Sequence, residues 1–390
     1  ISPWFIFMGM NFMSHMFTLT CALLATLGVL NLREQKTILW AVWTGLFLGI
    51  LVWTRQMDAL AMAFIIGLWS LPVKGRSFRF SPTLILGFTT IIVGSALLFY
   101  HKLLMNDYFY SPLVAYFDRK YGPGIYSLGF GPNKGVHWPL DPFPGHGLRD
   151  VVVNSMLNLF SINTDLFGWP FGSILFIGFF LLKGKLQKKD WQLLFFVAVI
   201  IGLYSLFWYN GGPDFGARYW FLIIIPCVIL TARGLTTLTN LINRDSPEDY
   251  SLSPTLLPIL SLALLTLFIY IPWRSIDKYY HFRGMRPDIK RFIHNDQFNN
   301  SIVLIQGPPH PDYVSAAIYN PFDFFSSKPI FARDINSIVR NRLFSVYQDR
   351  KFWLVEGPSI TGNGYKVIKG PMSAMKLKGI LENEASFIAP

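Results

Sequence analysis

The stretch FSPTLILGFTTIIVGSALLFY, residues 80–100, contains no charged residue. A helix of about 20 apolar residues, at about 1.5 Å rise per residue, crosses a hydrocarbon core of about 30 Å. Other uncharged, mostly apolar stretches lie before and after it, at residues 37–54, 59–73, 166–182, 191–209, 219–232 and 250–273. This series predicts an α-helical polytopic membrane protein.

Residues 1–32 are also free of charge, but Asn11, Ser14 and His15 interrupt them. We interpret this region as the end of one helix, a short turn and a second helix from about Ser14. The chain is therefore expected to hold about eight transmembrane helices and a fragment at its start. Because it begins at Ile1 inside an apolar run, without the basic region of a signal peptide, we expect it to be the C-terminal part of a longer protein.

Lys and Arg residues alternate between the loops, and this alternation sets orientation across a membrane. The turns after the second and sixth spans carry only Arg55 and Arg218, respectively. The other short loops carry Arg33 and Lys36, then Lys74, Arg76 and Arg79, then Lys183, Lys185, Lys188 and Lys189, then Arg233 and Arg244. We assign these basic loops to the cytoplasm. The long loop 106–150 and everything after residue 273 are then expected at the outer face of an integral membrane protein.

The composition agrees with this interpretation. Hydrophobic residues make up 52% of the chain and charged residues 14%, whereas a soluble protein has about 25% charged residues. The net charge of +12 is explained by loops beside anionic lipid, so no nucleic-acid partner is inferred. Cys21 and Cys227 lie inside apolar stretches and predict helix packing rather than disulfides.

The composition changes after residue 273. Short β-branched runs predict buried strands at Ser301–Gln306, 329–332 and 351–355, with a helix at 334–347. Residues 286–295 predict another helix, with Pro287 in its first turn. Residues 1–273 are therefore expected to form a transmembrane helical domain, and residues 274–390 an extracytoplasmic α/β domain.

The outer loop 106–150 is rich in Gly, Pro and aromatic residues. Loops of this length are usually functional or disordered, so a lid or a sugar-stacking surface is predicted, with an inert interfacial loop as the alternative. It holds Arg119, His137, Asp141, His146 and Arg149, and of these His137, His146 and Arg149 are the candidates for substrate binding. The H-x3-D-x4-H spacing within this set matches no zinc pattern. No metal site or other cofactor is therefore predicted, although dependence on a divalent metal is left open.

Arg218 begins an apolar stretch of only 14 residues before Arg233. Fourteen residues span about 21 Å of helix, less than the hydrocarbon core. One of the two arginines is therefore expected to lie at membrane depth or to snorkel. Arg218 could grip a phosphate through its bidentate fork, or anchor the helix at the interface beside Tyr219 and Trp220.

Arg55 and Asp58, in WTRQMD, lie three residues apart and therefore on one helix face. They predict a local ion pair or, alternatively, two residues that line an active cleft. His15, in FMSH at the first outer turn, is a further candidate, although a lone histidine often only satisfies its neighbours. All of these side chains fall on the predicted outer side.

The sequence lacks a phosphate-binding loop, a dinucleotide fingerprint, an H-E-x-x-H helix and a G-x-S-x-G elbow. It also lacks a D-x-D motif, which argues against a nucleotide-sugar site in this chain. These absences favour a donor that needs no cytoplasmic nucleotide pocket.

Several motifs, in this order, resemble the GT-C glycosyltransferases, in the bacterial branch akin to protein mannosyltransferases and lipid A aminoarabinose transferases. They are Ser2-Pro3 with Met13-Ser14-His15, GLFLGILVWTRQMDAL (45–60), LFGWP (166–170), FGARY (215–219) with Pro226, and ARGL (232–235). The resemblance covers most of residues 1–241. It implies inverting transfer of a sugar from a polyprenyl-phosphate carrier to a glycan, lipid or protein acceptor, at the outer face of a bacterial inner or plasma membrane.

The resemblance also implies roles for single residues. Arg218 would grip the phosphate, and Arg55, Asp58 and His15 would line the cleft. A fixed cation stabilises the phosphate as it leaves, and a carboxylate deprotonates the acceptor hydroxyl. That catalytic acid lies in the family's first outer loop, hence upstream of Ile1, so no catalytic residue is assigned here.

Two other function classes were considered. A transporter or flippase of polyprenyl-linked glycans would need polar groups at the bilayer midplane and usually repeated halves, and the sequence has neither feature. A non-catalytic membrane scaffold is disfavoured by the long outer loop and by the polar residues on one side.

Overall fold

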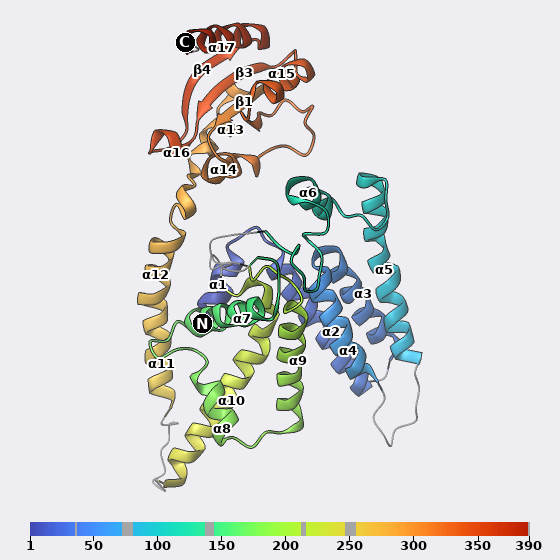
Figure 1. Cartoon of the computed structure of the whole chain (residues 1–390). Coiled ribbons are helices and arrows are strands. Elements are labelled where there is room, and N and C mark those ends of the chain that lie inside the picture. The colour runs from blue at the N-terminus through green and yellow to red at the C-terminus, as the bar shows by residue number, and fades with distance from the viewer. Residues whose placement is uncertain (36, 72–80, 137–143, 212–215, 246–254, 389–390) are drawn as a thin grey trace. The chain divides into compact units, whose positions relative to one another are not determined.

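The structure, a computed structural model, describes residues 1–35, 37–71, 81–136, 144–211, 216–245 and 255–388. Two compact units divide the chain, Ile1–Ile271 and Pro272–Pro390. The first is built of helices, and the second carries a small sheet flanked by helices (Figure 1). Each unit is described by itself below.

The first unit contains helices of very different lengths. Its elements are α1 (Pro3–Gly9), α2 (His15–Gln35), α3 (Ile38–Thr54), α4 (Gln56–Ser70), α5 (Ser81–Met105), α6 (Pro112–Tyr121), α7 (Leu148–Asp165), α8 (Leu175–Lys183), α9 (Lys188–Tyr204), the 3-10 helix η1 (Arg218–Ile223), α10 (Ile224–Asp245), α11 (Leu256–Leu265) and the π-helical turn η2 (Thr266–Tyr270). The predicted helical fold is therefore present.

Within the described residues, four helical stretches are long and apolar enough to cross a membrane. They are His15–Gln35, Ser81–Met105, Arg218–Asn243 and Leu256–Gly284. Helices α3 and α4 are apolar but shorter. The structure thus supports a helical protein with several candidate spans, and fewer helices meet these criteria than the eight that were expected.

The stretch 166–182 is predicted as one span, and this prediction is wrong. Its helix, α8, has only nine residues, which extend over about 13.5 Å. The preceding residues turn instead, with positive φ angles of +66° at Gly168 and +93° at Gly172. The Asn163 side chain holds this turn by accepting a hydrogen bond of 3.2 Å from the backbone of Ile174.

The predicted end of the helix after Ala232 is also wrong, because α10 continues to Asp245. Arg233 therefore lies inside a helix rather than in a loop. Its guanidinium donates two hydrogen bonds, of 3.2 and 3.1 Å, to the carboxylate of Asp190 on α9 and lies 5.2 Å from the ring centroid of Phe180. Because the Asp190 carboxylate neutralises Arg233, α10 can continue beyond this charged residue.

Helix α3 packs closely against α5, and small residues make this possible. A Cβ atom added at Gly49 would lie 2.5 Å from Cβ of Val93, and one at Gly45 would lie 2.6 Å from the carbonyl oxygen of Leu86. Glycines four residues apart on one face let two helix backbones approach. The Gly45-x-x-x-Gly49 pattern is therefore a packing feature of this unit.

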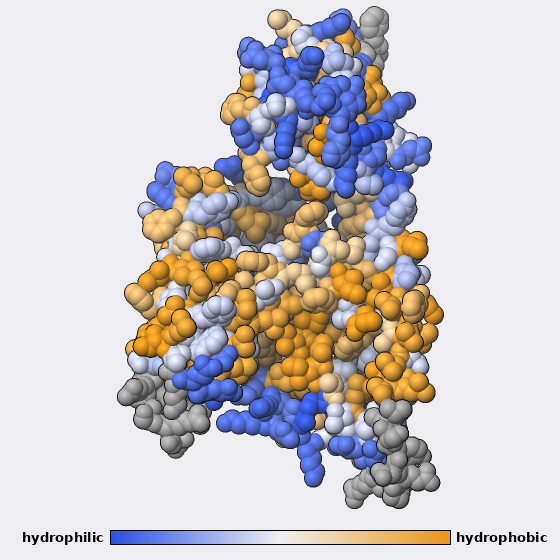
Figure 2. All heavy atoms as spheres, turned by 180° about the vertical axis from the view of Figure 1, so that it is seen from behind, coloured by the Kyte–Doolittle hydropathy of each residue, from blue (hydrophilic) through white to orange (hydrophobic). Residues whose placement is uncertain are grey.

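The exterior of the helical unit is largely apolar. On α5, the side chains of Leu84, Ile91 and Leu103 are 69%, 71% and 83% exposed. Orange, hydrophobic side chains cover much of the helical unit in Figure 2, whereas the surface of the second unit is mostly blue. Exposed apolar surface of this extent indicates contact with an apolar phase.

The second unit is built on a four-stranded mixed sheet of order β2-β1-β3-β4. Strand β1 (Ser301–Gln306) is parallel to β2 (Ile330–Arg333) and β3 (Lys351–Glu356), and β4 (Lys366–Met372) runs antiparallel to β3. The three predicted strands are confirmed. Strand β4 escaped prediction because most of its residues are exposed or half-buried, so no apolar run marks it.

Helices on both faces bury the central strands. Val303 and Ile305 of β1 face one apolar cluster, and Ile302 and Leu304 face the other. The helical elements from Ile271 onward are α12 (Ile271–Arg274), η3 (Ser275–Tyr279), η4 (Phe282–Gly284), η5 (Pro287–Ile289), α13 (Lys290–Ile293), η6 (Asp296–Phe298), η7 (Pro309–Tyr313), α14 (Val314–Ala317), α15 (Ser337–Val346), α16 (Pro358–Thr361) and α17 (Ala374–Ile388). The helix predicted at 334–347 is α15, whereas the one predicted at 286–295 is the short pair η5 and α13.

Candidate functional site

Arg55 lies where α3 ends and α4 begins. Its backbone is extended, with φ −148° and ψ 92°, so the chain bends here and the side chain points into the unit. Its three guanidinium nitrogens each donate a hydrogen bond: Nε to the Asp58 carboxylate, one terminal nitrogen to Nε2 of His15 at 3.1 Å, and the other to the Tyr204 hydroxyl at 2.9 Å. A guanidinium with all three nitrogens engaged is held in one position.

The other members of this cluster are also buried. The Asp58 side chain is 3% exposed and His15 is 3% exposed. The Tyr204 hydroxyl donates to Asp58 at 2.7 Å, so the carboxylate accepts hydrogen bonds on both oxygens. The ion pair predicted between Arg55 and Asp58 is thus present, and His15 is a hydrogen-bond acceptor within the same network because a guanidinium can only donate.

Arg218 lies at the start of η1, against two tyrosine rings. Its guanidinium carbon is 5.5 Å from the ring centroids of both Tyr209 and Tyr219, and a terminal nitrogen donates to the Tyr209 hydroxyl at 3.0 Å. Gly211, with φ +95°, passes close beside it, since an added Cβ would lie 2.9 Å from Cγ of Arg218. Only glycine fits this position without strain.

Arg218 has unused hydrogen-bonding capacity. Its Nε atom is buried without a hydrogen-bond partner, and within the described ranges its guanidinium meets no carboxylate, unlike that of Arg55. A buried donor without a partner costs about 1–3 kcal/mol. Arg218 is therefore the arginine of this cluster that has no carboxylate partner among the described residues.

Tyr219 connects the two arginines. The Arg55 guanidinium carbon lies 5.0 Å from its ring centroid, and the ring stacks on Tyr204 with centroids 5.5 Å apart. Cations over aromatic faces gain roughly 0.5–2 kcal/mol, most when desolvated. The structure thus brings four predicted residues, His15, Arg55, Asp58 and Arg218, into one neighbourhood around an aromatic ring.

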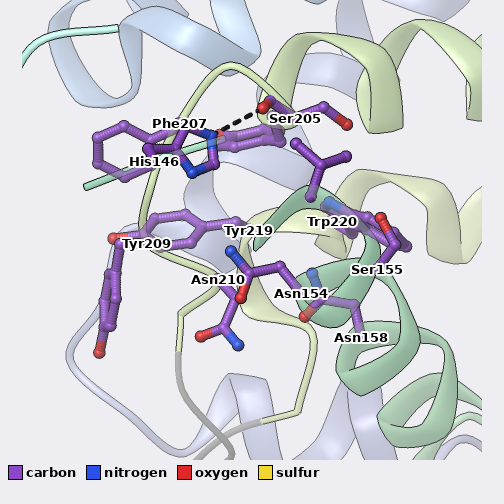
Figure 3. A pocket seen from close by; sticks show the side chains of 12 residues that line it. His146, Asn154, Ser155, Asn158, Ser205, Phe207, Tyr209, Asn210, Tyr219 and Trp220 are labelled. Atoms are coloured by element: carbon purple, nitrogen blue, oxygen red, sulfur yellow. Dashed lines mark hydrogen bonds between the residues drawn. The ribbon is translucent and has the colours of Figure 1, made fainter. Parts of the chain in front are cut away.

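A narrow cavity adjoins this cluster (Figure 3). Its volume is about 10 Å³, roughly the room that one water molecule needs. The residues that line it are His146, Val151, Asn154, Ser155, Asn158, Tyr204, Ser205, Phe207, Tyr209, Asn210, Tyr219 and Trp220. Two of the tyrosines that contact the arginine side chains, Tyr209 and Tyr219, therefore also form its wall.

His146 is buried in the cavity wall and ordered by its contacts. Its ring packs against Phe130, with centroids 5.4 Å apart, and Nε2 donates to the carbonyl oxygen of Ser205 at 3.0 Å. Arg149, by contrast, is exposed at the start of α7 and lines a second groove, which shares only His146 with the cavity. Of the loop candidates, only His146 is placed in the wall of this cavity.

The remaining loop candidates do not extend the site. His137 and Asp141 lie outside the described residues, and Arg119 is exposed on α6. Among the residues that the structure describes, no group of three or more His, Cys, Asp or Glu side chains could hold a metal ion. The central cluster presents donors and a cation, which suit an anionic ligand.

Sequence reasoning did not identify several residues of the site. Tyr204 and Tyr209 lie at the aromatic-rich end of an apolar stretch, where tyrosine is common at membrane interfaces, so they did not stand out. Asn154 and Asn158 are four residues apart on α7, a spacing that places two polar side chains on one helix face. That spacing was the available signal, and it required recognition of 148–165 as a helix.

Comparison with protein-family models, with curated proteins and with solved structures gives no match. The resemblance to GT-C glycosyltransferases therefore rests on the motifs quoted above. Two of those motifs contain Arg55 with Asp58 and Arg218, the residues that the structure gathers around Tyr219.

Proposed function

We propose that the protein acts as an integral-membrane glycosyltransferase of the GT-C type, which moves a sugar from a polyprenyl-phosphate donor to an acceptor. The observation that carries this proposal is the environment of Arg218. Its guanidinium is packed between tyrosines, has a buried Nε without a partner and lies at one end of a candidate span. A lipid-linked phosphate is an anion that would reach such a position from the membrane.

In this proposal Arg218 binds the phosphate that leaves with the lipid carrier. A fixed guanidinium donates charge-assisted hydrogen bonds to phosphate oxygens and stabilises the negative charge that develops as the bond to the sugar breaks. Tyr209 and Gly211 fix the arginine from either side, so little reorganisation is required when the phosphate arrives.

Arg55 has a different proposed role. Its three nitrogens are occupied by Asp58, His15 and Tyr204, so it acts as a positioning residue. It holds the Tyr219 ring, on which Arg218 also rests. Asp58 neutralises Arg55 and leaves Arg218 as the binding charge.

The proposal includes an arrangement in the membrane. About eight helices would cross it, with the basic loops in the cytoplasm and the Arg218 cluster at the outer face. The exposed lysines between α8 and α9, which are Lys183, Lys185, Lys188 and Lys189, support a cytoplasmic position for that loop. The second unit would then lie outside the cytoplasm, where a glycan, lipid or protein acceptor is presented.

The test is transfer of radiolabelled sugar from a polyprenyl-phosphate donor in membranes that carry the protein. Arg218→Ala should lower the transfer rate by about 10²–10³-fold, the usual effect of removing one stabilising donor. Arg218→Lys should recover part of it, because lysine keeps the charge but loses the fork. Arg342→Ala, an exposed arginine of the second unit, serves as the matched control.

Two outcomes would contradict the proposal. Unchanged transfer in the Arg218→Ala variant would remove the phosphate role of this residue. Movement of an intact lipid-linked sugar across the membrane, without release of the sugar, would instead favour a flippase.

A further inference from the structure

The wall of the cavity contributed by α7 carries the amide of Asn158. This residue is 5% exposed and lines the cavity. In the part of the chain that the structure describes, its side chain forms no hydrogen bond. An amide has an acceptor oxygen and two donor hydrogens, so Asn158 can bond to a polar group that enters the cavity.

The other residues that line the cavity are polar and uncharged, or aromatic or aliphatic. Asn154 donates to the carbonyl oxygen of Trp208 at 3.2 Å, while the Ser155 hydroxyl lines the cavity beside it (Figure 3). Among the described lining residues there is no Asp, Glu, Lys or Arg. His146, the one titratable nitrogen base in the wall, donates through Nε2 to Ser205. The wall thus offers hydrogen bonds without formal charge.

The cavity adjoins the proposed phosphate position. Tyr209 and Tyr219 line it, and the rings of both lie 5.5 Å from the Arg218 guanidinium carbon. A group bound by Arg218 would therefore lie beside tyrosines that form the cavity wall. The volume of about 10 Å³ admits one group the size of a water molecule, such as a single hydroxyl.

We propose that this cavity receives a hydroxyl of an uncharged sugar whose phosphate is held by Arg218, and that Asn158 is its hydrogen-bond partner. This inference rests on the proposed function. It assigns the donor to the neutral sugars, because an ammonium or carboxylate on that part of the ring would be buried without a countercharge. Burial of an unpaired charge is far more costly than burial of a hydroxyl.

The experiment measures ligand binding by the whole chain in detergent, through the fluorescence of Trp220, which lines the cavity, and of its neighbour Trp208. The probes are geranyl phosphate, geranyl-phosphate-linked mannose and geranyl-phosphate-linked 4-amino-4-deoxyarabinose. We expect the mannose compound to bind about tenfold more tightly than geranyl phosphate, and the amino sugar compound to gain nothing.

Two variants separate recognition from folding. Asn158→Leu should remove the tenfold advantage of mannose and leave binding of geranyl phosphate unchanged, since one hydrogen bond to a buried group corresponds to about tenfold in affinity. Asn158→Asp should reverse the preference and favour the amino sugar, an effect that a merely structural asparagine would not produce. Thr164→Val, on the same helix outside the cavity lining, is the control.

The outcomes separate a failure of this inference from a failure of the proposed glycosyltransferase function. Equal binding of all three probes, or a mannose advantage that survives in Asn158→Leu, overturns the assignment of the cavity. Tighter binding of the amino sugar by the unmodified protein overturns the neutral-sugar class. No binding of geranyl phosphate, or binding unaffected by Arg218→Ala, overturns the phosphate site and with it the proposed function.

Discussion

The helical unit and the α/β unit each contain an ion pair between an arginine and a buried carboxylate. The pairs are Arg55 with Asp58 and Arg340 with Asp334. The carboxylates are equally hidden, with side chains 3% and 2% exposed. Their settings differ, because Arg55 also holds His15 and lies within a unit whose exterior is apolar, whereas Arg340 lies on α15 in a unit with a hydrophilic surface.

The comparison shows how surroundings decide the value of the same ion pair. A pair close to water can be replaced by solvation of either partner, so its loss is modest. In an apolar unit, water cannot solvate a charge that has lost its partner. Substitutions at each pair, and at the contacts around it, test this difference.

Asp58→Leu should destabilise the helical unit by about 3–5 kcal/mol, because it leaves Arg55 buried without a countercharge. Thermal unfolding in detergent, followed by loss of the monodisperse peak in size-exclusion chromatography, measures this effect. The double variant Arg55→Met with Asp58→Leu should recover most of the stability. No recovery would mean that the network contributes more than charge balance.

Gly49→Leu should weaken the contact between α3 and α5 by about 1–3 kcal/mol or more, since the new side chain overlaps Val93. The same chromatographic assay applies. Gly87→Leu is the matched control, because a Cβ at Gly87 on α5 meets nothing within 4 Å. Equal effects of the two substitutions would show that helix propensity, rather than backbone approach, governs this interface.

Arg340→Met should destabilise the α/β unit by only about 1–2 kcal/mol, because Arg340 is 20% exposed and water can enter in its place to solvate the buried Asp334 carboxylate. Hydrogen exchange of β1 and β2, measured by mass spectrometry, reports on this unit alone. A loss as large as that of Asp58→Leu would refute the contrast drawn above.

Tyr365→Phe should change how the stability of the α/β unit depends on pH. Burial raises the pKa of Tyr365 to about 12, above its ordinary value of about 10. The unfolded chain therefore releases this proton first, so the contribution of Tyr365 to stability is complete below about pH 10 and is lost as pH rises toward 12. The phenylalanine variant lacks this pH-dependent contribution, so its stability, measured by calorimetry, should fall less steeply between pH 10 and pH 12. Parallel pH profiles would contradict a buried Tyr365 hydroxyl.

The sequence predicted the helical fold and three strands of the sheet because both follow from apolar runs. Strands β1 and β3 are buried on both faces and therefore read as continuous apolar segments. Strand β4 and the amphipathic helix α7 lack such runs. The stretch 166–182 was wrongly predicted as one span for the opposite reason, since its residues are apolar but its glycines turn the chain.

The site was predicted in part. Arg55 with Asp58 could be paired from helical spacing alone, and Arg218 stood out as a charge beside a short apolar stretch. The approach of Arg55 to Tyr219, and the supply of Tyr204 from α9 and of Asn158 from α7, depend on contacts between segments about 60 to 165 residues apart. Such contacts leave no trace in local periodicity.

The pair between Arg233 and Asp190 also bears on how the protein is made. Chains are synthesised from the N-terminus, so α9 with Asp190 emerges from the ribosome before α10 with Arg233. An arginine within a segment otherwise suited to insertion raises the energy of entry into lipid, by less here than the roughly 2.5–3.5 kcal/mol of a helix centre, because Arg233 pairs with the lysine-rich end of α9. A carboxylate that has already been delivered by the preceding helix offsets this penalty, so we expect α9 and α10 to enter the bilayer as a hairpin rather than one at a time.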